Sequence, residues 1–147
     1  MASKIELEND LKLAMKSGDG LRKSVIRMAL SAVKLAEIDK GASLDEAGVI
    51  SILQKEVKSR RESIADAEKA SRSDLIAEAQ AEIGVLEGYL PKAFTIQELE
   101  EMARQAIQET GATSLREMGL VMKVLVPRLQ GKATGDQASQ MVRKLLA

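Results

Sequence analysis

The chain lacks three residue types that carry much of protein chemistry. Its 147 residues include no histidine, no cysteine and no tryptophan. Without cysteine there is no disulfide framework, no thiolate nucleophile and no cysteine-ligated zinc or iron–sulfur site. Without histidine no imidazole titrates near neutral pH, so serine–histidine and cysteine–histidine catalysis are excluded on this chain alone.

Aromatic residues and long apolar runs are also scarce. Tyr89 and Phe94 are the only aromatics, which excludes a platform on which single-stranded nucleic acids stack their bases. The most apolar stretch, residues 25–36, is interrupted by Arg27 and Lys34. No run approaches the ~18 apolar residues that span a bilayer, and the first residues show no signal-peptide core. We therefore expect a cytoplasmic protein that does not associate with membranes.

The net charge is zero, because 22 lysines and arginines balance 22 aspartates and glutamates. The distribution is nevertheless uneven. Residues 11–36 hold six cationic side chains against one acidic (+5), and residues 113–147 hold six against two (+4). Such segments can bind phosphates in a salt-dependent way, and solvated helix faces are the ordinary alternative. For residues 113–147 the two interpretations are equally compatible with the sequence.

The sequence contains a strong helical pattern. Apolar residues recur at three- and four-residue spacing, and no segment alternates as a half-buried strand does. The pattern indicates an all-α fold with helices at about residues 4–17, 20–38, 44–70, 74–90, 96–110, 115–126 and 135–146.

Helix starts are marked by serine or threonine followed three residues later by glutamate or glutamine, the capping-box pattern. This pattern predicts caps at Ser3, Ser43, Thr95, Ser114 and Thr134. Asp19 is the expected cap of the second helix, and Ser71 or Ser73 that of the fourth.

The two prolines indicate breaks in the helical pattern. Pro91 lacks a backbone N–H and disfavours helix at the residue before it, so we expect a domain boundary there. Residues 1–92 are predicted to form an antiparallel helical bundle, and residues 93–147 a small three-helix subdomain. Pro127 is expected to end or kink the sixth helix.

One charged residue falls on an apolar stripe of the third helix. Arg60 stands between Val57 and Ile64, and a buried charge needs a partner. We expect an inter-helix ion pair with Glu37 or Glu82, and the alternative is a ligand contact.

Seven motifs follow one another along the chain, at residues 21–28, 36–41, 54–64, 86–92, 111–114, 118–123 and 131–133. Together they resemble the YqeY family, part of the wider GatB/YqeY group. The resemblance implies two all-helical subdomains. It also implies kinship with the tail domain of the B subunit of the tRNA-dependent amidotransferase, which helps hold tRNA. Family descriptions add a label of carbon–nitrogen ligase with glutamine as amido-nitrogen donor.

The basic C-terminal segment and the resemblance together define a candidate nucleic-acid-binding site. Lys123, Gly131 and Lys132 fall on motif positions that suit RNA backbone contact, and Gly119 falls on the family's Met-Gly position. Thr134 stands where the family often has aspartate, and either residue can cap a helix. The predicted site residues are Arg116, Gly119, Lys123, Arg128, Gly131, Lys132, Arg143 and Lys144.

No catalytic constellation, phosphate loop or metal motif is present in the sequence, so we expect no catalytic residue, metal or cofactor. The leading hypothesis is a non-catalytic helical protein that binds tRNA, or a tRNA-handling amidotransferase-like complex, through residues 113–147. One alternative is an adaptor that holds a partner helix. Another is an enzyme acting on an amide or ester, which would depend on lysine, serine and carboxylates alone. The family resemblance adds the carbon–nitrogen ligase with glutamine as amido-nitrogen donor.

Overall fold

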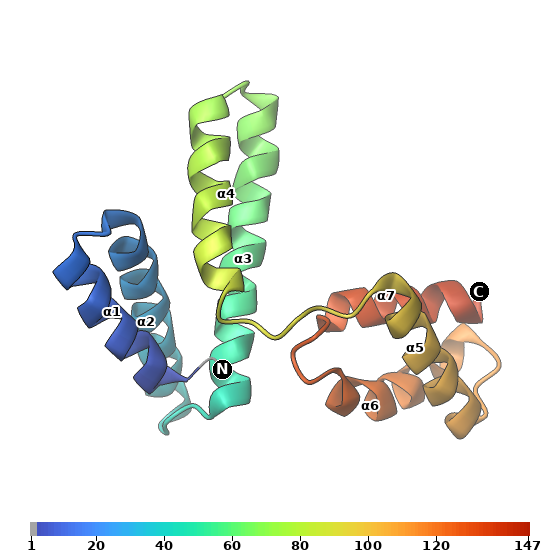
Figure 1. The fold of residues 1–147 in the computed structure, drawn as a ribbon. Coiled ribbons are helices and arrows are strands. Elements are labelled where there is room, and N and C mark those ends of the chain that lie inside the picture. Colours follow the sequence, from blue (N-terminus) through green and yellow to red (C-terminus); the bar gives the residue numbers. More distant parts are fainter. Residues whose placement is uncertain (1–2) are drawn as a thin grey trace. The chain divides into compact units, whose positions relative to one another are not determined.

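The computed structural model describes residues 3–147, and this part of the chain contains helices and no strand (Figure 1). The prediction of an all-α fold is confirmed. A short 3₁₀ turn, η1 (Leu115–Glu117), precedes the sixth helix. The helices are α1 (Lys4–Ser17), α2 (Gly20–Lys40), α3 (Glu46–Lys69), α4 (Ser73–Glu87), α5 (Ile96–Thr110), α6 (Met118–Leu129) and α7 (Gly135–Leu146).

The helices fall into two compact units, Met1–Pro91 and Lys92–Ala147, called here the N-terminal and the C-terminal unit. Each unit has its own apolar core. The core of the N-terminal unit includes Leu7, Ile26, Leu53 and Leu86. The core of the C-terminal unit includes Ala103, Val121, Leu125 and Val142. Burial of these side chains away from water is the main force that holds each unit together.

The N-terminal unit consists of two helical hairpins. α1 packs against α2 and α3 against α4, while α2 contacts both helices of the second hairpin. Figure 1 shows that the far end of the α3–α4 hairpin extends beyond α1 and α2. No helix in residues 3–147 is both long and apolar enough to cross a bilayer.

Four of the predicted helix caps are confirmed. The Ser3 hydroxyl accepts a hydrogen bond from the Glu6 N–H, and the Asp19 carboxylate accepts one from the Arg22 N–H. Thr95 and Thr134 form complete capping boxes with Glu98 and Gln137. Each of these contacts satisfies backbone donors that the first helical turn leaves without partners.

Three predicted caps are wrong. Asp45 replaces Ser43 as the cap of α3, because the Glu37 carboxylate accepts the Leu44 N–H (2.9 Å) and moves the helix start to Glu46. α4 begins after Arg72 without a side-chain cap, so neither Ser71 nor Ser73 caps it. Ser71 instead adopts a left-handed φ of 53° in the short link between the two helices.

The third wrong prediction is the Ser114 cap, because the chain enters α6 through the 3₁₀ turn. The Ser114 side chain forms no cap hydrogen bond. The carboxylate of Glu117 instead accepts hydrogen bonds from the N–H and the hydroxyl of Thr113. The partner of Glu117 is therefore one residue earlier than the capping pattern predicts.

Pro127 lies inside α6, which continues to Leu129, so the predicted end at residue 126 is wrong. A proline in the last turn removes only one helical hydrogen bond, the one that would reach the Lys123 carbonyl. The helix ends two residues later, where Gln130 and Gly131 adopt left-handed φ angles of 49° and 77°.

The predicted ion pair of Arg60 with Glu82 is confirmed. Arg60 is 6% exposed. Its Nε lies 2.7 Å from Glu82 Oε2 on α4, and its Nη1 lies 2.8 Å from Glu56 Oε2. Burial lowers the pKa of Arg60, but the hydrogen bonds to Glu56 and Glu82 outweigh that effect and raise it. Glu37, the other predicted partner, pairs with Lys4 at 2.8 Å.

Candidate nucleic-acid interface

α6 presents an exposed stripe on the side opposite to its buried face. Val121, Leu125 and Leu129 are buried. At about 100° per residue, Gly119 and Lys123 project from the opposite side, and both are exposed. Arg116 is exposed in η1, directly before this helix. These three residues, Arg116, Gly119 and Lys123, are called the α6 stripe below.

The α6 stripe carries unpaired positive charge. Within residues 3–147 neither Arg116 nor Lys123 forms an ion pair. No acidic residue occurs in the sequence between Glu117 and Asp136. The two cations are therefore available to a negatively charged ligand, and nearby carboxylates on α6 do not oppose it.

Gly119 is not required by packing. A Cβ added at this position would meet no heavy atom within 4 Å. The helical backbone is therefore uncovered on this side and accessible to a ligand at close range.

Arg128 lies away from the α6 stripe, although it was predicted as part of the same site. Five residues along the helix from Lys123, it points about 140° away around the axis. Its Nη1 and Nη2 lie 3.1 Å and 2.5 Å from the two carboxylate oxygens of Glu109 on α5. The hydrogen bond from Arg128 lowers the pKa of Glu109. This bidentate ion pair connects α5 to α6, so the guanidinium already has a partner.

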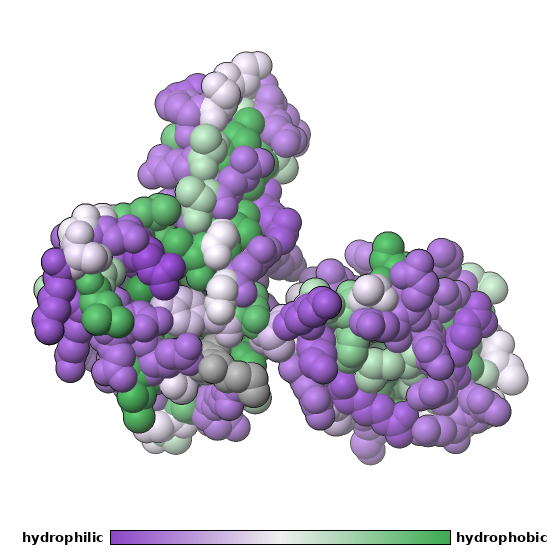
Figure 2. Space-filling view, viewed as in Figure 1, coloured by the Kyte–Doolittle hydropathy of each residue, from purple (hydrophilic) through white to green (hydrophobic). Residues whose placement is uncertain are grey.

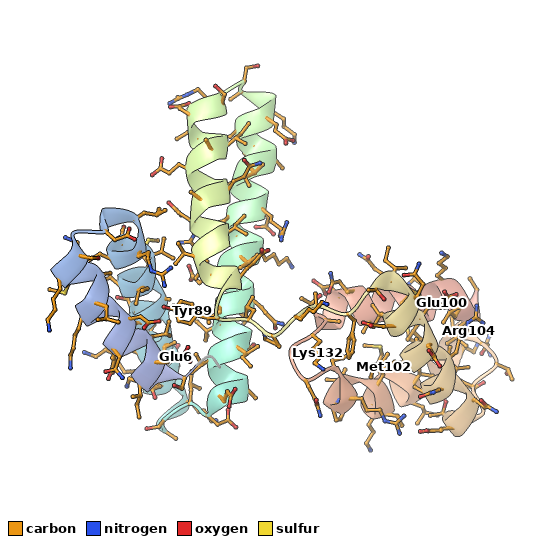
Figure 3. The ribbon with its side chains drawn as sticks, viewed as in Figure 1. Glu6, Tyr89, Glu100, Met102, Arg104 and Lys132 are labelled. Carbon is orange, nitrogen blue, oxygen red and sulfur yellow. The ribbon has the colours of Figure 1, made fainter. Side chains whose placement is uncertain are left out.

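Lys132 and Gly131 form part of a loop that is fastened to the segment before α5. The Phe94 N–H donates to the Lys132 carbonyl (2.8 Å), and the Lys132 N–H donates to the Leu129 carbonyl (2.9 Å). The Lys132 Nζ lies 5.5 Å from the centre of the Phe94 ring. Figure 3 labels Lys132 in this loop. The left-handed φ of Gly131 gives this glycine a conformational role in the turn.

Arg143 and Lys144 are exposed in the last turn of α7. Cations at a helix C-terminus interact favourably with the helix dipole, so they have a structural reason to be there. The structure thus divides the predicted residues into three groups. These are the α6 stripe, the end of α7, and residues that already hold intramolecular contacts (Arg128, Gly131 and Lys132).

The acids of the C-terminal unit lie mainly on α5. This helix carries Glu98, Glu100, Glu101 and Glu109. Arg104 neutralises one of them through a 2.8 Å ion pair with Glu100, and both residues are labelled on α5 in Figure 3. Within the C-terminal unit, acidic side chains are therefore concentrated on α5, and cationic ones on α6 and α7. The zero net charge of the chain does not reveal this difference.

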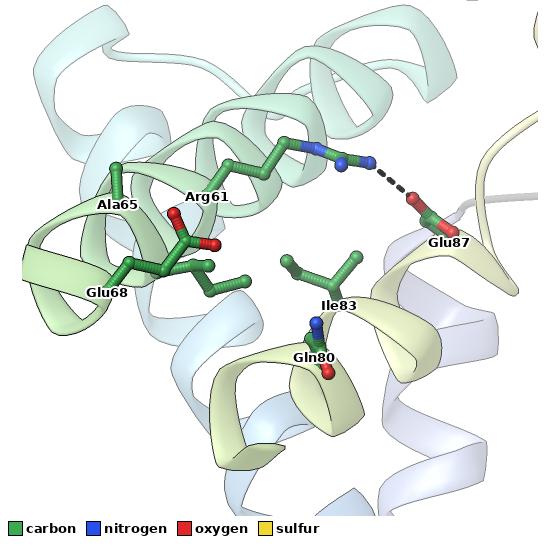
Figure 4. Close-up of a pocket in the computed structure, with 7 residues that line it drawn as sticks. Arg61, Ala65, Glu68, Gln80, Ile83 and Glu87 are labelled. Carbon is green, nitrogen blue, oxygen red and sulfur yellow. Dashed lines mark hydrogen bonds and ion pairs between the residues drawn. The ribbon is translucent and has the colours of Figure 1, made fainter. Parts of the chain in front are cut away.

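The N-terminal unit has a shallow groove of about 550 Å³ between α3 and α4. Ile64 and Ile83 are among its lining residues, and an ion pair of 2.8 Å joins Arg61 to Glu87 (Figure 4). Glu68 and Gln80 also line it. Within the described part of the chain no group of three acidic side chains is placed to hold a metal ion. The groove presents no nucleophile beside a base.

One polar cluster, around Tyr89, was not predicted from the sequence. The Tyr89 hydroxyl donates to Asp10 Oδ2 at 2.5 Å and accepts from the Arg22 guanidinium at 3.5 Å. Side chains of α1, of α2 and of the segment after α4 thus meet beside a hollow of about 260 Å³ lined by Asp10 and Arg22. The scarcity of aromatics could have drawn attention to Tyr89, but nothing in the sequence indicates its partners.

Comparison with known proteins gives consistent matches. The family model described as "Yqey-like protein" matches residues 4–146. Proteins named "Altered inheritance of mitochondria protein 41, mitochondrial" are similar to the chain. The one from Kluyveromyces lactis is 39% identical over 103 residues, which cover 69% of this chain and 55% of that protein. The one from Lachancea thermotolerans is 41% identical over 85 residues, 57% of this chain and 46% of that protein.

The chain therefore spans about half the length of these relatives. Their names contradict the expectation of a cytoplasmic protein, because each is described as mitochondrial. The expectation rested on the missing signal-peptide core, which speaks only against secretion. That absence does not distinguish the cytosol from the interior of an organelle.

Proposed function

Since the chain belongs to the YqeY family, we propose that it is a non-catalytic helical protein that binds tRNA, or a tRNA-handling complex, through its C-terminal unit. The observation that supports this most is the α6 stripe, where Arg116 and Lys123 are exposed beside an uncovered helix backbone and form no ion pair within residues 3–147. Phosphate contacts of lysine and arginine supply most of the affinity in such complexes.

The chemistry of the surface favours a folded RNA. The two aromatic residues cannot stack a series of bases, because Tyr89 is buried and Phe94 lies against Lys132. Contacts from the α6 stripe would therefore be made to phosphates and ribose. Arg143 and Lys144 are proposed to extend the surface. Arg128 and Lys132 are expected to contribute less, because their side chains already hold partners.

We also propose that the chain has the subdomain arrangement of the GatB/YqeY group. In it, residues 1–92 form an antiparallel bundle, and residues 93–147 form the tail-like subdomain that holds the RNA.

Filter binding with total tRNA, and with tRNA isolated from mitochondria, tests the proposal. Contacts to 3–4 phosphates predict that the logarithm of affinity falls with that of salt concentration with a slope of about −3. Reversing two contacts with Arg116→Glu and Lys123→Glu should reduce this slope by about 2. Lys55→Glu with Lys69→Glu, both exposed in the N-terminal unit, is the matched control and should change neither affinity nor slope. Absence of binding at low salt, or equal binding by both double variants, would reject the proposal.

The carbon–nitrogen ligase label remains the enzymatic alternative. With this activity, the purified chain would release ammonia from glutamine in the presence of aminoacylated tRNA. Turnover that exceeds the background of a denatured sample would contradict the non-catalytic proposal.

A further inference from the structure

α2 carries a line of large apolar side chains that the N-terminal unit covers only in part. Leu21, Met28 and Leu35 are 41%, 52% and 62% exposed. They are seven residues apart, and seven residues are close to two helical turns, so the three form one line of roughly 21 Å along the helix. These residues are called the α2 stripe below.

The α2 stripe is centred away from the face of α2 that packs into the core, although the Met28 sulfur accepts a hydrogen bond from the Arg60 guanidinium at 3.7 Å. Val25, Ile26, Ala29 and Val33 are each at most 1% exposed. The α2 stripe lies roughly 110° around the axis from the centre of this buried face. Exposed apolar side chains are common when they are scattered singly, whereas these three recur at heptad spacing in one row, with Ser24 and Ser31 at the positions where a coiled coil carries its second apolar row.

Positive charge accompanies the α2 stripe. Lys23, Arg27 and Lys34 follow one side of α2, and within residues 3–147 none of them pairs with a carboxylate. Lys12 and Lys16 add exposed charge on α1 and likewise have no ion-pair partner among the described residues. In Figure 2 apolar patches lie among polar ones over the α1–α2 hairpin.

We propose that the α2 stripe binds an acidic amphipathic α-helix of a partner protein. Large apolar residues at seven-residue spacing on that helix would pack between Leu21, Met28 and Leu35. Aspartates or glutamates on its flank would face Arg27 and Lys34. Complementary charges of this kind determine the choice of partner in helix pairs.

A helix fits this surface better than a bilayer or a nucleic acid does. Ser24 and Ser31 lie directly beside the α2 stripe and are exposed, so the apolar line is one residue wide. Membrane-surface helices present a broad apolar face instead. A nucleic acid would neutralise the lysines but leave the apolar side chains in water. The proposal is independent of the proposed tRNA site, which lies on other helices.

Binding can be measured with a synthetic helix of 21 residues. The probe carries leucines at heptad spacing, glutamates on both flanks and a single tryptophan. Because the chain itself has no tryptophan, the fluorescence of the probe reports binding to the 147-residue chain. A second peptide with lysine at every glutamate position is the charge control. We expect the acidic peptide to bind and the basic peptide to bind much more weakly.

Two sets of variants separate the apolar from the charged contribution. Leu21→Ser, Met28→Ser and Leu35→Ser combined should weaken the acidic peptide at least about tenfold, since burial of even one leucine contributes that much. Leu75→Ser with Leu120→Ser, also exposed apolar positions, should leave binding unchanged. Arg27→Glu with Lys34→Glu should shift the preference toward the basic peptide. Far-UV circular dichroism and thermal unfolding establish that each variant keeps its fold.

Four results would overturn the proposal. The acidic peptide could bind no better than the basic one, or equally well to the triple serine variant. Phosphatidylglycerol vesicles could bind through the α2 stripe while the peptide does not, which would identify a membrane surface. Sedimentation could show that the α2 stripe joins two copies of the chain, which would identify the partner as the protein itself.

Discussion

At the scale of single residues, the contact of Tyr89 with Asp10 best shows how the fold changes side-chain chemistry. Tyr89 is only 6% exposed and follows the end of α4, whereas Asp10 is on α1. Burial, and then the hydrogen bond to Asp10, raise the pKa of Tyr89 well above its ordinary value of 10.0. Deprotonation would remove the donor of this hydrogen bond and place two negative charges side by side.

The raised pKa predicts a loss of stability in alkali. A group whose pKa is raised by folding contributes its full stabilisation below the pKa of the unfolded state, about 10 for tyrosine, and loses it as the pH rises toward the folded value. Urea unfolding between pH 9 and 11 should therefore show a decline that is shallower in Tyr89→Phe. Because Tyr89 is the only tyrosine, absorbance at 295 nm follows its ionisation directly. A titration midpoint near that of free tyrosine would contradict the prediction.

At the scale of elements, the glycines of the C-terminal unit have different roles. Gly111 ends α5 with a left-handed φ of 70°, whereas Gly119 lies in the regular helix α6. Neither would place an added Cβ within 4 Å of another heavy atom. Backbone conformation alone therefore distinguishes them: alanine is strained at Gly111 and favoured at Gly119.

Two alanine variants should therefore have opposite effects on stability. Gly111→Ala should lower the free energy of unfolding by about 1 kcal/mol, and Gly119→Ala should raise it by roughly 0.5–1 kcal/mol. Urea unfolding monitored by circular dichroism measures both. If the α6 stripe binds RNA through close backbone approach, Gly119→Ala should weaken tRNA binding while it stabilises the fold. A destabilising effect of Gly119→Ala would mean that the glycine is needed by the fold itself.

At the scale of the whole molecule, the two separate cores predict two unfolding events. Leu53 and Leu125 are fully buried, each in the core of a different unit, and no residue belongs to both cores. Loss of packing in one unit should therefore leave the core of the other intact.

Leu125→Ala should destabilise the C-terminal unit by about 2–5 kcal/mol. The fluorescence of Tyr89, which lies in the N-terminal unit, should keep its midpoint of unfolding, while part of the circular dichroism signal unfolds at lower urea. Leu53→Ala should instead shift the Tyr89 transition. If both signals moved together in both variants, the two units would unfold as one cooperative block.

The sequence by itself determined the all-α fold, four helix caps, and the need of Arg60 for an acidic partner, which it narrowed to Glu37 or Glu82. These depend on apolar periodicity, local hydrogen bonds and the need of a buried charge for a partner, all of which act on residues whose spacing can be read directly. Basic residues of the candidate site were likewise visible as a charged segment. Their arrangement in space, however, depends on the direction in which each side chain points and on the neighbouring segment that it contacts.

Only the tertiary structure decided which cations are available. Arg128 is occupied by Glu109, and Lys132 lies over Phe94, whereas Lys123 has no ion-pair partner in the described part of the chain. These partners, one on α5 and one in the segment before it, lie 19 and 38 positions away in the sequence, and spacing along the chain carries no information about them. The observed start of α3 differs from the predicted one for the same reason, because Glu37 on α2 accepts a hydrogen bond from the Leu44 N–H. Local chemistry determines the helices, and contacts between helices determine which side chains remain free to bind.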